Sequence, residues 1–80
     1  MKIIGYKRSD FTPPEGSLVT GYNVYFTYPA TGEDAGGVIC ERIYFSDAKL
    51  AKSGYKLHVG DEVRISYNRY GKPDTIVVVK

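Results

Sequence analysis

Residues 38–54 read VICERIYFSDAKLAKSG, and this stretch decides the fold that the sequence predicts. β-branched and aromatic residues fill its first half, which predicts a strand over 38–45. Ser46 follows as a helix N-cap, Asp47 places an acid in the first turn, and a glycine stands where a helix would end. The stretch therefore predicts a strand that runs directly into one short helix over 47–53.

Four further strands are expected around this unit. The clearest covers 18–28, where aromatic and β-branched residues alternate between two faces. A first strand over 3–8, a fourth over 63–68 and a fifth over 75–79 complete the set. Loops that contain Pro, Gly and Asp separate them. In the fifth strand nearly every residue is β-branched, which is typical of a strand buried on both faces or against a partner.

The resulting order, β-β-β-α-β-β, is that of the OB-fold, a five-stranded Greek-key barrel. Eighty residues amount to one domain. We therefore predict an all-β domain with one short helix, spanning residues 1–80 as a single OB-fold-like barrel. In that fold the second and third strands present an open face. The loops between strands one and two and between strands four and five close over it, to hold single-stranded nucleic acid or sugars.

Charge and cysteine content narrow the function classes. Residues 1–40 carry three basic and four acidic side chains (net −1), and residues 41–80 carry eight and five (net +3). That balance permits a nucleic-acid partner without demanding one.

No apolar run is long enough to cross a membrane or to form the core of a signal peptide. With one Cys and one His, no internal disulfide or metal cluster is expected. We expect a cytoplasmic protein without cofactor, in which a homodimer supplements a small core.

Catalytic residues are not apparent. His58 has no neighbouring nucleophile in the sequence, and Cys40 lies in a strand without a nearby base. The glycines at 36–37 lead into a strand, whereas a phosphate-binding loop would lead into a helix. We expect a protein that is not an enzyme.

A polar and aromatic face is the candidate binding surface. Asn23 and Tyr25 lie on the more polar face of the second strand, and Arg42 and Tyr44 lie on the corresponding face of the third. Nucleic-acid bases stack on aromatic rings for about 1–3 kcal/mol each, and basic side chains neutralise phosphates. The alternative is that the two tyrosines form an ordinary cross-strand aromatic pair with a structural role.

Basic residues also mark the two loops that would flank this face in a barrel. Two precede the first loop, and a basic–aromatic–Gly–basic sequence forms the last turn, over 69–72. Such a tip suits a clamp on the sugar–phosphate backbone, although charges also protect a solvated hairpin from edge pairing. The predicted nucleic-acid-binding residues are Lys7, Arg8, Asn23, Tyr25, Arg42, Tyr44, Arg69, Tyr70 and Lys72.

The chain resembles a known family in its size, strand order and residue pattern. The first strand ends in Lys-Arg-Ser at 7–9, the second strand is aromatic, and the chain closes with Tyr-Gly at 70–71 and a β-branched run at 76–79. These features resemble the small single-stranded-DNA-binding proteins of filamentous phages. The resemblance implies a homodimer of phage or mobile-element origin that coats single strands cooperatively with tyrosines, arginines and lysines. The acidic pair Glu33 and Asp34 departs from the family, so no DNA contact is expected at that hairpin tip.

We therefore predict a non-catalytic single-stranded-DNA-binding domain. Two alternatives stay open: a protein-interaction module that docks a partner on the same aromatic sheet, and an RNA-binding domain of the same fold. Tyrosine and arginine are also typical of protein interfaces, so these residue types do not discriminate. The response to salt does, because phosphate binding weakens as salt is added, whereas a hydrophobic interface tolerates it.

Overall fold

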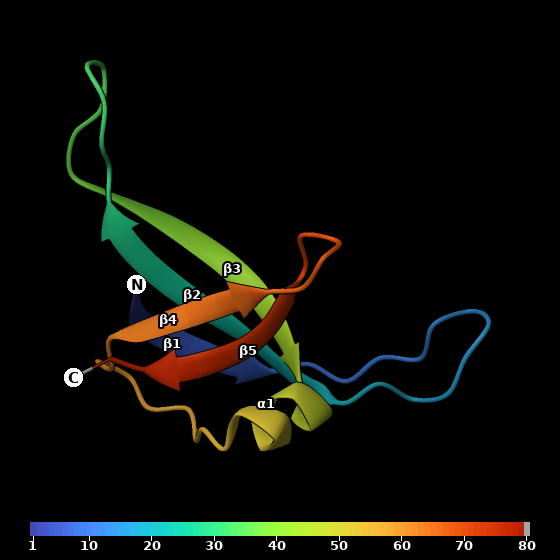
Figure 1. Cartoon of the computed structure of the whole chain (residues 1–80). Coiled ribbons are helices and arrows are strands. Elements are labelled where there is room, and N and C mark those ends of the chain that lie inside the picture. Colours follow the sequence, from blue (N-terminus) through green and yellow to red (C-terminus); the bar gives the residue numbers. More distant parts are fainter. Residues whose placement is uncertain (80) are drawn as a thin grey trace.

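The structure is a computed structural model, and it describes residues 1–79 (Figure 1). The predicted order of elements is confirmed: β1 (Lys2–Arg8), β2 (Gly21–Pro29), β3 (Val38–Ser46), α1 (Asp47–Ser53), β4 (Val63–Tyr67) and β5 (Pro73–Val78). The helix has the predicted bounds because its ends are capped as expected. The Ser46 hydroxyl accepts a hydrogen bond from the Lys49 amide, and Gly54 ends the helix in the left-handed conformation, at φ 66°. Residues 1–79 contain one helix, α1, and it is neither long enough nor apolar enough to cross a membrane.

The predicted five-stranded barrel is wrong, because the strands form two separate sheets. One sheet has the order β1-β2-β3 and the other pairs β4 with β5, all antiparallel. Closure would require the outer edge of β5 to pair with another strand, but side chains of α1 occupy that edge. Lys49 Nζ donates to the Pro73 carbonyl at 2.7 Å, and Ser53 Oγ accepts from the Ile76 amide at 3.0 Å.

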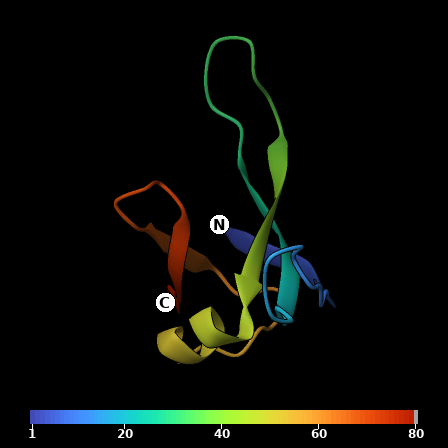
Figure 2. The same ribbon diagram turned by 90° about the vertical axis from the view of Figure 1, so that its right-hand side faces the viewer.

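A single hydrophobic core lies between the two sheets, with α1 at one end of it (Figure 2). The Phe26 and Phe45 rings meet edge to face at its centre, with centroids 6.4 Å apart. Both rings are fully buried, and Tyr22 is partly buried against this core. The buried residues are Ile3, Val24, Phe26, Ile43, Phe45, Leu50, Val63, Ile65 and Ile76.

The first residues of β1 connect the two sheets. The Ile3 amide donates to the Asp61 carbonyl at 3.0 Å, and the Gly60 amide donates to the Ile3 carbonyl at 2.8 Å. An isolated bridge between Lys2 and Glu62 continues this pairing into the start of β4. The same part of β1 pairs with β2, where Ile3 lies opposite Phe26. A register irregularity between Ile3 and Gly5 ends this double pairing.

Two segments project beyond the packed sheets (Figure 1). The β2–β3 hairpin extends past the β4–β5 layer, so Val38 and Ile39 are 65% and 43% exposed although β3 is buried further along, at Ile43. The loop between β1 and β2 forms an arm that a bridge between Phe11 and Val19 closes. Burial of β5 on both faces is not found within the described chain: Val77 and Val78 of the strand and Val79 just after it are exposed. The alternative that a partner covers this strand stays a prediction.

Gly21, where β2 begins, allows the close approach of β3. A Cβ at this position would collide with the Phe45 carbonyl oxygen and lie 2.7 Å from the Tyr44 hydroxyl. We expect Gly21→Ala to lower the free energy of unfolding by about 1–3 kcal/mol, since overpacking moves backbone and side chains. Urea denaturation measures the change. The matched control Gly36→Ala faces open space and should stay within about 0.5 kcal/mol of the parent. Equal effects of the two substitutions would contradict the proposed steric cause.

Candidate nucleic-acid interface

The register of the three-stranded sheet brings five of the nine predicted residues to one surface. Tyr25 lies opposite Arg42, and Asn23 lies opposite both Lys7 and Tyr44. Directly paired residues share a face of the sheet. This face points away from the core, because the neighbouring residues Val24 and Phe26 point into it. We call it the outer face, and it comprises Lys2, Lys7, Asn23, Tyr25, Thr27, Cys40, Arg42 and Tyr44.

Tyr25 occupies the open centre of the outer face. Its neighbour on β1 is Gly5, which has no side chain, and its neighbour on β3 is Arg42. Tyr25 is 37% exposed, and no other ring in residues 1–79 pairs with it. The alternative of a cross-strand aromatic pair is wrong, because Tyr44 lies diagonal to Tyr25 and opposite Asn23. One side of the Tyr25 ring is thus flanked by a position without a side chain.

Tyr44 belongs to the outer face, but its far end is engaged. The hydroxyl donates to the Ser9 carbonyl at 3.1 Å, and the ring meets Phe11 of the arm edge to face at 5.5 Å. Burial, and then the charges of Asp10 and Asp47, raise the pKa of Tyr44. This tyrosine therefore supports the arm with part of its ring and leaves only the rest accessible.

The cations divide into free and engaged groups. Lys7 and Arg42 are exposed, and within residues 1–79 neither forms an ion pair. Arg8 points to the opposite face of the sheet. Its guanidinium binds both carboxylate oxygens of Asp47, at 3.1 and 2.9 Å, and lies 5.1 Å above the Tyr22 ring. Arg8 thus holds β1 to the start of α1, and it does not contribute to the outer face.

The turn between β4 and β5 lies away from the outer face. Because the β4–β5 sheet packs on the core side of the other sheet, its turn is on the opposite side of the molecule (Figure 2). The expectation that Arg69, Tyr70 and Lys72 flank the candidate face depended on a closed barrel, and it is wrong. Tyr70 is 76% exposed beside the Arg69 guanidinium, and the Asn68 side chain accepts hydrogen bonds from the Tyr70 and Lys72 amides.

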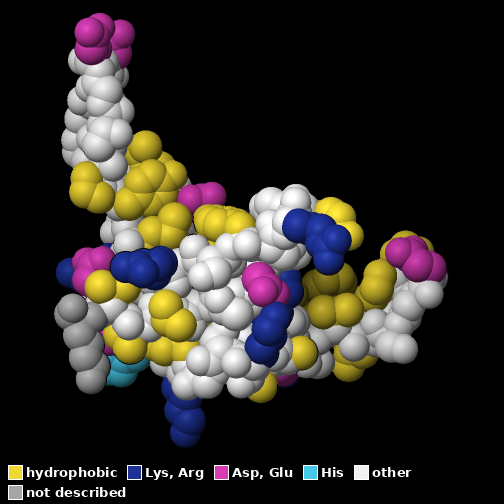
Figure 3. Space-filling model, in the orientation of Figure 1, with side chains coloured by type: hydrophobic (Ala, Val, Ile, Leu, Met, Phe, Trp, Pro, Cys, Tyr) yellow, Lys and Arg dark blue, Asp and Glu magenta, His cyan; other side chains and the backbone are white. Residues whose placement is uncertain are grey.

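The β2–β3 hairpin carries its acids at the tip and hydrophobic side chains at its base (Figure 3). Glu33 and Asp34 are exposed there, as the sequence indicated. At the base, burial and then the charge of Glu41 raise the pKa of Tyr28. Glu33 and Asp34 would repel a phosphate backbone at the tip. Beside Tyr25 the accessible positive charge is that of Arg42, which pairs with it across the strands.

Two contributions to this surface were not anticipated. Gly5, which lies opposite Tyr25, has no side chain and leaves space beside that ring. The packing of Phe11 on Tyr44 had no sequence signal, since the loop pattern does not show where an arm will fold back. Within residues 1–79, His, Cys, Asp and Glu side chains form no group of three that could hold a metal ion.

Comparison with known proteins adds no relative: no family model, no curated protein and no solved structure matches this chain.

The ion pair of Arg8 with Asp47 predicts a pH dependence. A hydrogen bond from Thr20, and then the contact with Arg8, hold the pKa of Asp47 below 3.8. A carboxyl group with a lowered folded-state pKa stabilises the fold above its unfolded pKa, and this stabilisation is lost as the pH falls through the folded value. We expect Asp47→Asn to be less stable than the parent at pH 7. The difference should begin to shrink as the pH falls towards 3.8 and should vanish only at a lower pH, once Asp47 is protonated in the folded protein. Urea midpoints across this range measure it, and a difference that persists at the lowest pH would contradict the charge-based cause.

Proposed function

We propose that the protein binds single-stranded DNA, without catalysis, on the outer face of its three-stranded sheet. The observation that carries the proposal is the pairing of exposed Tyr25 with Arg42, next to the side-chain-free position Gly5. An accessible ring beside an unpaired guanidinium offers stacking and charge neutralisation together. Sequence preference should be weak, since every base has a face that can stack.

Five residues of the outer face have distinct parts in this mechanism. A base stacks on Tyr25, over the space beside Gly5, and Arg42 meets the adjoining phosphate. Lys7 and Asn23 belong to the next row of the sheet, two residues along β2 and therefore about 7 Å away. At that spacing the Lys7 ammonium can reach a second phosphate, and the Asn23 amide can hydrogen-bond to a base edge. Tyr44 braces the arm next to them.

The preference for DNA over RNA rests on the resemblance to the small filamentous-phage proteins, as does a phage or mobile-element setting. RNA offers the same bases and phosphates and adds the 2′-hydroxyl. A deoxy- and a ribo-oligonucleotide of equal sequence therefore separate these two ligands in the assays described below.

Association with another protein chain is the second candidate function, and a specific observation favours it. Hydrophobic side chains are exposed on β4, on β5 and at the base of the β2–β3 hairpin, and a second copy of this chain could cover them in a homodimer. They are Val38, Ile39, Tyr67, Val77, Val78 and Val79. Light scattering coupled to size-exclusion chromatography tests this proposal, which requires a mass of twice 8.9 kDa.

The stacking role of Tyr25 predicts a selective loss of affinity. We expect Tyr25→Ala to weaken binding to a labelled oligo-dT about 5- to 150-fold, since stacking contributes about 1–3 kcal/mol per base. Fluorescence anisotropy at low salt measures the affinity. Tyr70→Ala removes a more exposed tyrosine on the opposite side of the molecule and should leave affinity unchanged. The outer face would be excluded if Tyr70→Ala weakened binding while Tyr25→Ala, still folded, did not.

The charge role of Arg42 predicts a change in salt dependence. The logarithm of the binding constant falls against the logarithm of salt concentration with a slope of about −0.7 per neutralised phosphate. Lys7 and Arg42 together predict a slope of about −1.4, and Arg42→Gln should reduce it by about 0.7.

Arg8→Gln is the matched control for this measurement, because its guanidinium is bound to Asp47. It should alter the urea midpoint but leave the salt slope as it was. Duplex DNA of equal length should bind more weakly than the single strand, because paired bases are not free to stack on Tyr25. A slope near zero for the parent protein would instead favour the protein-partner function.

A further inference from the structure

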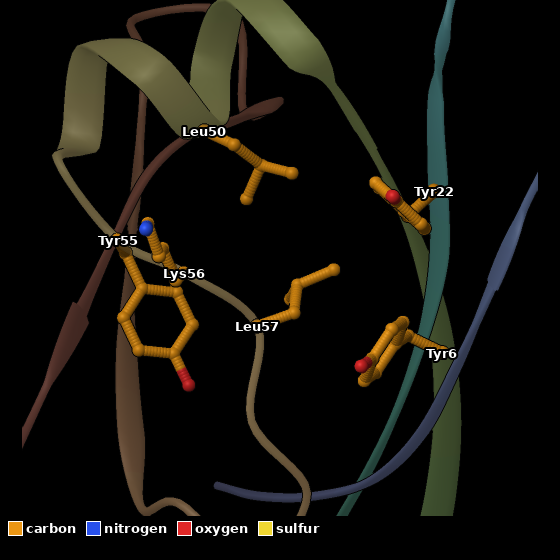
Figure 4. A pocket seen from close by; sticks show the side chains of 6 residues that line it. All are labelled: Tyr6, Tyr22, Leu50, Tyr55, Lys56 and Leu57. Atoms are coloured by element: carbon orange, nitrogen blue, oxygen red, sulfur yellow. The ribbon is translucent and has the colours of Figure 1, made fainter.

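A cavity of about 270 Å³ lies on the core side of the β1–β2 pair, opposite the outer face (Figure 4). Tyr6 and Tyr22 form one wall. The connection from α1 to β4 supplies Tyr55 and Lys56 on the other, and Leu50 and Leu57 lie between the walls. The volume exceeds the cavity of about 150 Å³ that can hold a benzene ring. It falls just below the range of about 300–1,000 Å³ typical of drug-sized ligands. One ring or a fused pair of rings therefore fits.

The walls of this cavity are aromatic and rigidly held. Tyr6 and Tyr22 pack edge to face with centroids 5.7 Å apart, and the Arg8 guanidinium covers another part of Tyr22. The Tyr55 hydroxyl donates to Asp61 at 2.8 Å. Burial, and then this hydrogen bond, raise the pKa of Tyr55 to about 12, so its side chain is neutral at pH 7. Three uncharged rings from separate segments thus face a space that could receive a flat ring.

The charges around the cavity favour an anionic substituent on that ring. Lys56 is the charged residue of the lining, it is exposed, and within residues 1–79 it forms no ion pair. No acid lines the cavity within the described residues. Asp61, which accepts the Tyr55 hydrogen bond, also lies 3.5 Å from His58 Nδ1. The Lys56 ammonium is therefore available to an incoming anion.

We propose that this cavity is a binding site for a planar aromatic ring that carries one anionic group, with the ring packed against the Tyr6–Tyr22 wall and Leu57 and the anion at Lys56. An aromatic carboxylate and a mononucleotide share this chemistry. The site shares no side chain with the outer face, so it is independent of the proposed binding of single-stranded DNA. The Tyr25→Ala variant should therefore lose affinity for oligo-dT while its cavity remains intact.

Titration of the ¹⁵N-labelled protein with two probes, 2-naphthoate and thymidine 5′-monophosphate, tests the proposal. Neutral 2-naphthamide is the control for charge. For the better of the two anions we expect a dissociation constant on the order of 0.1–1 mM, as suits a ligand of this size. The amide shifts should be confined to the residues that line the cavity and their neighbours. The anion that binds more tightly identifies the source of the ring, a carboxylate or a nucleotide.

Variants separate the charge from the ring. Lys56→Gln should weaken 2-naphthoate binding about three- to tenfold and abolish its preference over 2-naphthamide. Lys72→Gln, an equally exposed lysine on the β4–β5 turn, should change neither. Tyr6→Leu retains an apolar wall without the ring, and it should weaken 2-naphthoate and 2-naphthamide alike.

Three results would overturn the proposal. The first is the absence of localised shifts with both anions at concentrations up to about 5 mM, well above the affinity expected for such ligands. The second is equal affinity of the parent protein for 2-naphthoate and 2-naphthamide. The third is the same loss in Lys72→Gln as in Lys56→Gln, which would show that the anion responds to overall charge. The exposed Lys56→Gln substitution keeps the test valid even where Tyr6→Leu disturbs folding.

Discussion

The double pairing of Ile3 is the interaction on which the rest of the structure depends. Its side chain is fully buried, its backbone bonds to residues 60 and 61, and it lies opposite Phe26 of β2. These contacts place the β4–β5 sheet over one face of the three-stranded sheet. That face becomes the core, and the other becomes the outer face. Without this junction, the alternating side chains of β2 would have no defined inside.

Contacts between α1 and the outer edge of β5 help to keep the two sheets separate. In a closed barrel, hydrogen bonds from a neighbouring strand would satisfy the outer edge of β5. Here a lysine ammonium and a serine hydroxyl of α1 bond two backbone groups of β5, the Pro73 carbonyl and the Ile76 amide, and an ion pair between Lys52 and Asp74 adds to the contact. An edge whose polar groups are already bonded no longer attracts a strand. The same short helix that favoured a barrel in the sequence thus contributes to keeping it open.

Two arginines of the three-stranded sheet have different environments. Arg8 and Arg42 both lie on strands of one sheet, but within residues 1–79 Arg8 is bound by two aspartates and Arg42 by none. Asp10 is a near neighbour of Arg8 in the sequence, but Asp47 lies 39 residues away and reaches Arg8 only through the placement of α1, which no sequence pattern shows. The same reasoning applies to Tyr25 and Tyr44, of which only Tyr44 lies against the arm.

Local chemistry in the sequence was sufficient to predict the order of the elements and the bounds of the helix. It also predicted that one face of the sheet is shared by Asn23, Tyr25, Arg42 and Tyr44. Capping residues, alternation and turn residues act over a few positions, so they can be interpreted without the fold. Only the tertiary structure decided that the sheets stay apart, that the 69–72 turn lies opposite the candidate face and that a cavity forms beside Tyr6. These features depend on contacts between segments far apart in the chain, such as Ile3 with Asp61 and Ser53 with Ile76. No local pattern encodes such contacts.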